Sequence, residues 1–264
     1  AVSLCISGSV LVVNATAGIL NETSKTMFKK YYIDGPELIA RQCFKFKVKK
    51  LIHISSVGVD SNSTNIYSRS KAIGEQKVIE NFVDAAIVRA SLVFGHEDRF
   101  FNRYASMAFY SPVLPLIGSL TKVQPVYVDD VAYAIEKIAL GRDLKGVFEL
   151  GGPEIFTFTE IIRKMLREIR RKRVIFSIPF GTAKFMALVF ELINKLTRGL
   201  APLPFTQDNV RQLQLDNVVS TKMRSFKFLK INPQNLDTIL PLYLYSFRPH
   251  GQYNEITRSA NKVN

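Results

Sequence analysis

The chain has few of the residues that build disulfide frameworks, metal centres and membrane spans. Its two cysteines, Cys5 and Cys43, favour a reducing compartment and exclude a disulfide framework. Its three histidines are isolated and lack metal-ligand spacing. No apolar run reaches membrane-spanning length, because charged residues interrupt the apolar stretch 180–196. We therefore predict a packed or surface-lying helix there.

Acidic residues are also scarce relative to basic ones. The chain has 36 Lys and Arg against 22 Asp and Glu, which gives a formal net charge of +14. The basic residues concentrate in 45–50 and 163–173. Such runs are compatible with a solvated face, with attraction to anionic lipid headgroups, or with an acidic protein partner. No helix-turn-helix, zinc-binding pattern or aromatic-basic sheet signature is present, so we expect no nucleic acid partner.

The apolar content, 47% of 264 residues, is sufficient for a sizeable core. Strand and helix patterns alternate along the chain, which predicts an α/β fold with a doubly wound parallel sheet. Strands are expected at 10–16, 51–55, 86–92, 126–128 and 147–153. Helices are expected at 24–44, 67–81, 99–109, 131–140, 160–169, 181–196, from 206 onward and at 235–245.

Several local signals refine this expectation. Asp34-Gly35-Pro36 predicts an irregularity within its helix, and Asp129 is a plausible N-cap for helix 131–140. Thr157 and Glu160 predict a capping arrangement. The two prolines of 111–118 predict a loop that covers a cleft.

One set of polar residues points to chemistry. The apolar strand 51–55 ends in Ser55 and Ser56, and Tyr67 and Lys71 lie four residues apart where the next helix begins. A lysine can lower the pKa of a neighbouring tyrosine, and a serine hydroxyl can hold a substrate oxygen. A Tyr-x-x-x-Lys pair can also be a plain surface pair. The preceding strand and its serines favour a proton-transfer site.

This arrangement resembles the short-chain dehydrogenase/reductase superfamily, in its extended and atypical branches. Three further segments are similar to family motifs: Asn14-Ala15-Thr16-Ala17-Gly18 to the turn after the fourth strand, Val88 to Gly95 to the Arg-Pro-x-x-Val-Phe-Gly strand, and Pro125 to Ala132 to the Val-Asp-Asp-Val-Ala element. The resemblance implies a Rossmann-like fold.

A narrower resemblance is visible in Glu97-Asp98-Arg99-Phe100. This segment, with 111–116 and 124–128, resembles the nucleotide-binding accessory subunits of respiratory complex I, of the alpha-subcomplex subunit 9 type, and their bacterial NAD-dependent epimerase/dehydratase-like relatives. The resemblance extends from about Val10 to about Val219.

The resemblance implies roles for individual residues. Tyr67 would be the general acid/base, Lys71 would lower its pKa and bind the nicotinamide ribose, and Ser56, or else Ser55, would orient a substrate. Arg89 could contact a ligand or anchor a loop, and Ala90 stands where the family often has a proline. The residues expected to contact the cofactor are Asn14, Thr16, Ala17, Gly18, Ser55, Lys71, Arg89, Ala90 and Phe94.

The family's Gly-x-x-Gly-x-x-Gly loop, which holds the pyrophosphate of the cofactor, follows no predicted strand here. Aligned with the family, Ala1 falls near the end of the third helix, so we expect roughly 70 residues of the fold to be missing, either from a fragment or from a remnant. The residue that distinguishes NAD from NADP lies in that part. Binding of NAD or NADP is expected to be weakened or lost.

These observations predict three parts: a partial NAD(P)-binding domain at 1–150, a smaller, mostly helical lobe at 151–248, and a flexible tail at 249–264. The family implies an accessory or assembly module of a respiratory NADH:ubiquinone oxidoreductase. Its partners would be complex I subunits and an anionic membrane surface. It would lie in the bacterial cytoplasm or on the cytoplasmic side of the inner membrane, or on the mitochondrial matrix side. The alternative is an NAD(P)-dependent oxidoreductase or epimerase acting on a small molecule or sugar nucleotide.

Overall fold

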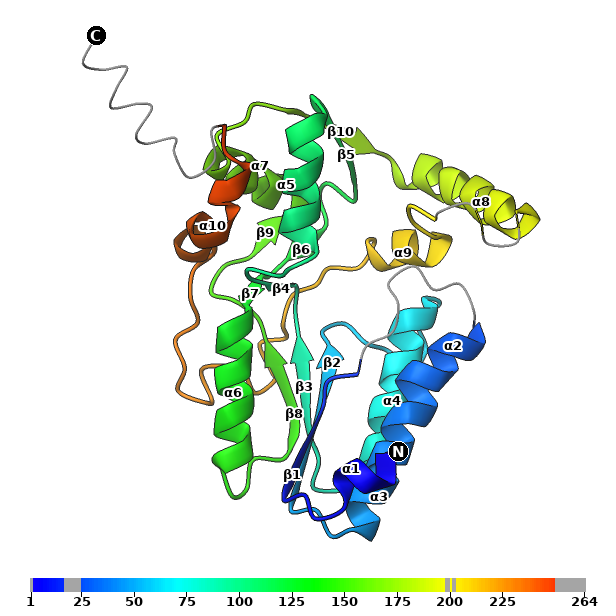
Figure 1. Cartoon of the computed structure of the whole chain (residues 1–264), viewed down its shortest axis with the longest axis vertical. Helices are drawn as coiled ribbons and strands as arrows, with labels where there is room; N and C mark the ends of the chain where they lie inside the picture. The colour runs from blue at the N-terminus through cyan, green and yellow to red at the C-terminus, as the bar shows by residue number, and fades with distance from the viewer. Residues whose placement is uncertain (1, 17–24, 198–199, 201–202, 250–264) are drawn as a thin grey trace.

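The computed structural model describes residues 2–16, 25–197, 200 and 203–249 (Figure 1). Its central element is a four-stranded parallel sheet with the strand order β1-β2-β3-β8. The strands are β1 (Leu11–Asn14), β2 (Lys50–Ser56), β3 (Ala86–Ala90) and β8 (Gly146–Leu150). The predicted parallel α/β fold is therefore confirmed.

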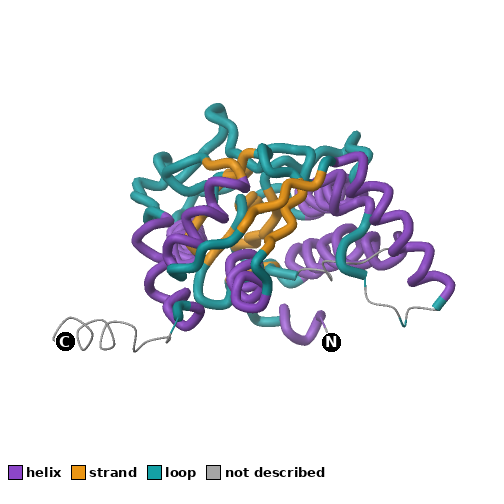
Figure 2. The backbone as a smooth tube through the Cα atoms, turned by 90° about the horizontal axis from the view of Figure 1, so that it is seen from above, coloured by secondary structure: helices purple, strands orange, loops and turns teal. Residues whose placement is uncertain are grey.

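Helices cover both faces of this sheet (Figures 1 and 2). The first face packs against α1 (Val2–Ile6), α3 (Gly35–Lys45) and α4 (Ile66–Asn81), and the second against α6 (Val128–Leu140). Successive strand residues point to opposite faces. Accordingly, Leu51 and Ile87 enter the core under α3 and α4, whereas Ile52 and Val88 enter the core under α6.

The predicted irregularity before α3 takes the form of a π-helix. Here α2 (Lys25–Lys29) continues into η1 (Lys30–Asp34), and α3 then begins at Gly35 with Pro36 in its first turn. A proline in the first helical turn removes no intrahelical hydrogen bond. The π-turn brings η1 against α4, the helix that carries Tyr67 and Lys71.

The part of the chain beyond the carboxyl ends of the strands forms a second lobe, at the top of Figure 1. It contains α5 (Phe100–Tyr110), α7 (Phe158–Glu168), α8 (Phe180–Leu196), α9 (Gln207–Gln212), α10 (Leu236–Leu244) and η2 (Tyr245–Phe247). Three short strand pairs complete it: β4 (Val93–Phe94) with β7 (Val126–Tyr127), β5 (Val113–Ile117) with β10 (Val174–Ile178), and β6 (Lys122–Val123) with β9 (Phe156–Thr157). Segments far apart in the chain share its core, which contains Phe101, Ile161 and Leu240.

Asp98, in the segment Glu97-Asp98-Arg99-Phe100, links two helices of this lobe. Asp98 Oδ1 accepts a hydrogen bond from the Phe101 N–H at 2.5 Å, in the first turn of α5. Its Oδ2 accepts one from the Tyr243 hydroxyl of α10 at 2.7 Å. Asp98 therefore ties the start of α5 to a helix almost 150 residues later in the chain.

Two local expectations are wrong. Residues 113–117 form β5 and pair with β10 instead of looping over a cleft, because Pro115 sits in a two-stranded ribbon that tolerates a missing N–H. The N-cap of α6 is Tyr127, since Val128 is already helical, and Asp129 accepts a hydrogen bond from the Tyr127 hydroxyl at 2.6 Å.

Other expectations are confirmed or stay open. The capping box of Thr157 and Glu160 is present at the start of α7. The tail at 250–264 lies outside the described residues, and the domain boundary at 150 stays a prediction. Among the described residues, no helix combines the length and apolar character needed to cross a membrane.

Candidate functional site

The hydroxyls of Ser56 and Tyr67 meet at the carboxyl end of the sheet. Ser56 ends β2, and Tyr67 lies in the first turn of α4, which begins after its N-cap Asn65. The Asn65 side chain accepts a hydrogen bond from the Ser68 N–H at 2.7 Å, which fixes where the helix starts. Ser56 Oγ and Tyr67 Oη are then 2.8 Å apart.

Lys71 lies one turn further along α4 and is buried, with 8% of its surface exposed. Its Nζ is 5.7 Å from the ring centroid of Tyr67 and 5.7 Å from that of Tyr32 in η1. The two rings meet edge to face at 5.3 Å. Burial lowers the pKa of Lys71 to about 8, and the nearby carboxylate of Glu75 opposes this shift.

The net shift of the Tyr67 pKa runs opposite to the lowering expected from Lys71. Burial raises the pKa of Tyr67 above its ordinary value of 10, and the hydrogen bond from Ser56 offsets only part of this rise. The Lys71 ammonium group lies over the tyrosine ring, 5.7 Å from its centroid. Desolvation of the phenolate therefore outweighs any attraction to the ammonium group.

Asn14 and His53 form a second polar pair on adjacent strands. They are partners in the β1–β2 register, and Asn14 Nδ2 lies 3.0 Å from His53 Nδ1. Asn14 Oδ1 accepts hydrogen bonds from the N–H and the hydroxyl of Thr16, so its amide must donate to the imidazole. The His53 proton then lies on Nε2. Burial, together with the charge of Lys71, lowers the pKa of His53 to about 4.

Ser55 is buried, with 3% exposure, and its Oγ has no hydrogen-bond partner within the described part of the chain. An unsatisfied buried hydroxyl is rare and costs free energy. It lies in the strand segment that also carries His53 and Ser56. An orphaned hydroxyl, the Ser56–Tyr67 hydroxyl pair and a buried ammonium at the carboxyl ends of parallel strands fit the ribose half of a nucleotide.

Arg89 of β3 belongs to a buried ion-pair network. Its guanidinium contacts Glu75 of α4 at 2.7 Å and Glu149 of β8 at 3.2 Å. Glu149 in turn accepts a hydrogen bond from the Ser220 N–H at 2.8 Å. Of the two roles considered for Arg89, these contacts support the anchor, because they tie α4, the sheet and a distant loop together.

Ala90 lies beside Ser56 in the sheet, whereas Phe94 is buried in the core. The carbonyl of Ala90 accepts a hydrogen bond from the Val57 N–H at 3.1 Å. Phe94 is 1% exposed and packs against Phe101 and Tyr127, so its side chain has a packing role. The predicted contacts Ala17 and Gly18 lie outside the described residues.

The structure adds three residues that sequence reasoning missed. Glu75 lies one helical turn beyond Lys71, a spacing that signals a pair. The π-helix η1 places Tyr32 next to Tyr67 and Lys71. Asp208 of α9 accepts hydrogen bonds from the N–H groups of Ile66, at 2.8 Å, and Tyr67, at 3.2 Å. No local pattern indicates the last two, because their contacts join segments far apart in the chain.

Comparisons with known proteins agree with this geometry. The profile of the RmlD substrate binding domain family matches residues 12–185. The chain belongs to this family. It is 32% identical to the 40 kDa subunit of NADH-ubiquinone oxidoreductase from Neurospora crassa, over 88% of the chain and 60% of that protein. It is 30% identical to the mouse NADH dehydrogenase [ubiquinone] 1 alpha subcomplex subunit 9, over 92% of the chain and 64% of that protein.

The resemblance inferred from the motif at 97–100 is thus confirmed, although the chain spans less than two thirds of the length of these relatives. Solved structures agree on the fold. The structure of gox2253 has a TM-score of 0.68 at 20% identity, covering 95% of this chain and 82% of its own. MoeE5, determined in complex with UDP-glucose and NAD, has a TM-score of 0.67 at 12% identity, covering 98% and 83%.

Proposed function

We propose that this chain is part of a nucleotide-holding accessory module of a respiratory NADH:ubiquinone oxidoreductase. The observation that carries the proposal is the match to the Neurospora crassa subunit over 88% of the chain. By this proposal its partners are complex I subunits. The module would be peripheral, on the matrix side of the inner membrane in mitochondria or the cytoplasmic side in bacteria.

The site residues support holding a nucleotide more than proton transfer. An efficient general base has a pKa near the working pH, whereas burial raises that of Tyr67. Lys71 would bind ribose hydroxyls, and Ser55 would donate its unused hydroxyl. When bound, NAD or NADP supplies a hydride acceptor. Residues 1–264 contain no glycine-rich pyrophosphate loop, so the proposal includes weak cofactor binding by these residues alone.

The surface of α8 supports assembly with a partner. Four of its apolar side chains are more than half exposed: Phe185 at 67%, Leu188 at 52%, Leu192 at 56% and Leu196 at 75%. They belong to the helix that projects from the upper lobe (Figure 1). Exposed apolar area on one helix is typical of a surface that a protein partner covers.

A complementation experiment in the full-length parent protein tests this proposal. In cells lacking the parent gene, Leu188→Glu with Leu192→Glu should lower incorporation into the assembled dehydrogenase, because two charges would enter an apolar contact. Gln76→Glu with Thr221→Glu, which adds the same two charges at exposed polar positions outside α8, is the matched control and should assemble normally. Native gels with activity staining measure both. Equal assembly of the two double variants would contradict the proposed contact.

The alternative function is an NAD(P)-dependent oxidoreductase or epimerase, favoured by the 2.8 Å contact between Ser56 and Tyr67. The same experiment separates the two classes through Tyr67→Phe, which removes only the hydroxyl. An accessory module should keep normal assembly and respiration with this variant while the gene deletion fails. Loss of a measurable hydride transfer in Tyr67→Phe would instead identify an enzyme.

A further inference from the structure

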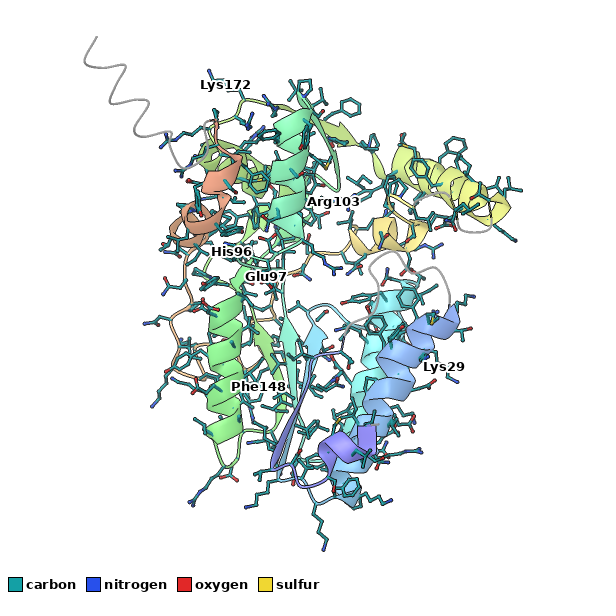
Figure 3. The ribbon with its side chains drawn as sticks, viewed as in Figure 1. Lys29, His96, Glu97, Arg103, Phe148 and Lys172 are labelled. Atoms are coloured by element: carbon teal, nitrogen blue, oxygen red, sulfur yellow. The ribbon has the colours of Figure 1, made fainter. Side chains whose placement is uncertain are left out.

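A concave basic site lies between the carboxyl end of α7 and β10, remote from the Tyr67 site. The cavity measures about 760 Å³, and Leu166 and Ile175 contribute its apolar lining. Its other lining residues all carry positive charge: Arg163, Arg167, Arg170, Arg171, Lys172 and Arg173. Figure 3 shows Lys172 at the end of the molecule opposite the lower end of the central sheet.

The backbone holds these cations in a fixed turn. The Arg171 N–H donates to the Leu166 carbonyl and the Arg170 N–H to the Arg167 carbonyl, both at 3.1 Å, which is the paired bonding of a Schellman motif. Arg170 occupies the left-handed position of this motif, with φ of 54°, where glycine is the usual residue.

Two of the side chains are further fixed by backbone carbonyls. Arg171 Nε donates to the Phe247 carbonyl at 2.9 Å, and Arg173 Nε donates to the Ala108 carbonyl at 2.8 Å. These contacts orient the guanidinium groups but supply no full negative charge. The pKa of Arg171 is lowered by burial and by the neighbouring charge of Arg173, which indicates crowding of like charges.

No acidic residue lines the cavity within the described part of the chain. The nearest carboxylate along α7, that of Glu168, is paired with Arg248. The carboxyl end of α7 contributes only about half an elementary negative charge. This cluster of basic side chains therefore favours an anion that accepts several charge-assisted hydrogen bonds, and a phosphate group has this chemistry.

Exposed apolar side chains lie on the two elements that border the basic site, α5 and β10, and are called the rim. Tyr110 is 84% exposed and Phe109 47%, at the end of α5, while Val174 and Phe176 of β10 are 65% and 59% exposed. The Arg171 guanidinium lies over the Phe109 ring, 4.6 Å from its centroid. A soluble phosphate compound would make no contact with this apolar rim. A phospholipid would, because its acyl chains begin next to its headgroup and can pack against apolar side chains.

We propose that this basic site binds the phosphate group of an anionic phospholipid at a membrane surface, with the rim of Phe109, Tyr110, Val174 and Phe176 contacting the lipid. This goes beyond the proposed accessory function, since it assigns a ligand to a second surface. The net charge suggests an attraction to anionic lipid, and the proposed site places this attraction at one end of the molecule.

Co-sedimentation with vesicles tests the site. The chain should bind vesicles of phosphatidylcholine with phosphatidylglycerol and not those of phosphatidylcholine alone. Replacing Arg163, Arg167 and Lys172, whose side chains are exposed, by Gln should weaken binding more than about tenfold. The matched control replaces Lys45, Lys47 and Lys49 by Gln. These lysines are exposed in the other basic run, near the lower end of Figure 1, and their replacement should weaken vesicle binding by less than about threefold. Equal losses would overturn the proposal, because net charge alone would explain them.

Substitutions in the rim distinguish a lipid ligand from a soluble phosphate compound. Tyr110→Ser with Phe176→Ser should lower vesicle binding while leaving the net charge unchanged, with circular dichroism confirming the fold. Titration with pyrophosphate should show much weaker binding than the anionic vesicles. Tight pyrophosphate binding, with vesicle binding that does not depend on Tyr110 and Phe176, would identify a soluble phosphate ligand and overturn the lipid assignment.

Discussion

Lys71 carries an electrostatic cost when it is charged, because burial removes its ammonium group from water. It is buried against two aromatic rings, and its pKa of about 8 lies below the ordinary 10.5. A protein gains no stability from a charge placed in this way. Buried groups with shifted pKa values gather at functional sites, so its position favours a ligand-binding role over a structural one.

Lys71→Met should stabilise the protein near neutral pH. The shift of the lysine pKa corresponds to a penalty of about 3 kcal/mol when the group is charged. Between about 8 and 10.5 the folded state binds fewer protons than the unfolded state, so the unfolding free energy of the unmodified chain should rise with pH in this window. The advantage of Lys71→Met should therefore shrink there.

Urea unfolding at several pH values measures this difference. Lys77→Met, at a partly exposed lysine of the same helix, is the control and should follow the pH dependence of the unmodified chain. A constant difference between Lys71→Met and the unmodified chain from pH 7 to beyond pH 10 would show that Lys71 is not desolvated as described.

At the scale of elements, the π-helix η1 and α4 form one unit that builds the site. Tyr32 of η1 contacts both Tyr67 and Lys71 of α4. The two helices approach closely at Gly74, where an added Cβ would lie 1.9 Å from the Tyr32 carbonyl oxygen. Glycine is needed there for the close approach of two backbones, since its φ is not positive.

Gly74→Ala should therefore destabilise the protein by about 2 kcal/mol or more, because backbone must move to admit the methyl group. Hydrogen exchange of residues 30–34 should also become faster. Gly181→Ala is the matched control, since nothing lies within 4 Å of its added Cβ, and helix propensity should make it neutral or stabilising by up to about 1 kcal/mol. Equal stabilities of the two variants would contradict the close contact.

Across the whole molecule, the upper lobe positions the site on the sheet. The Asp208 carboxylate caps the first turn of α4, and the Asn65 side chain donates back to the Asp208 carbonyl at 2.8 Å. The loop after α9 also reaches the sheet through Ser220 and Glu149. The helix that carries Tyr67 is thus held by a segment about 140 residues later in the chain.

Asp208→Ala should lower the unfolding free energy by about 1–2 kcal/mol, the usual cost of losing a helix cap. Exchange of the Ile66 and Tyr67 amides should increase, since both lose their acceptor. Asp84→Ala serves as the control, because its ion pair with Lys145 is 67% and 60% exposed, and it should change stability by less than about 0.5 kcal/mol. Unchanged protection of α4 in Asp208→Ala would show that α9 does not hold it.

The sequence by itself determined the alternating elements, the capping box of Thr157 and the spacing of Ser56, Tyr67 and Lys71. These features depend on local periodicity and on residues a few positions apart, so a single chain displays them. The strand at Pro115 is not evident from the sequence, because it forms by pairing with β10, a distant segment of the chain.

Only the tertiary structure decided how the site behaves. The direction of the Tyr67 pKa depends on burial, and the approach of Tyr32 and Asp208 depends on contacts between distant segments. The basic run at 163–173 was visible in the sequence, but its concave arrangement required the turn after α7. Spacing determines which side chains can meet, whereas packing determines their solvation and therefore their chemistry.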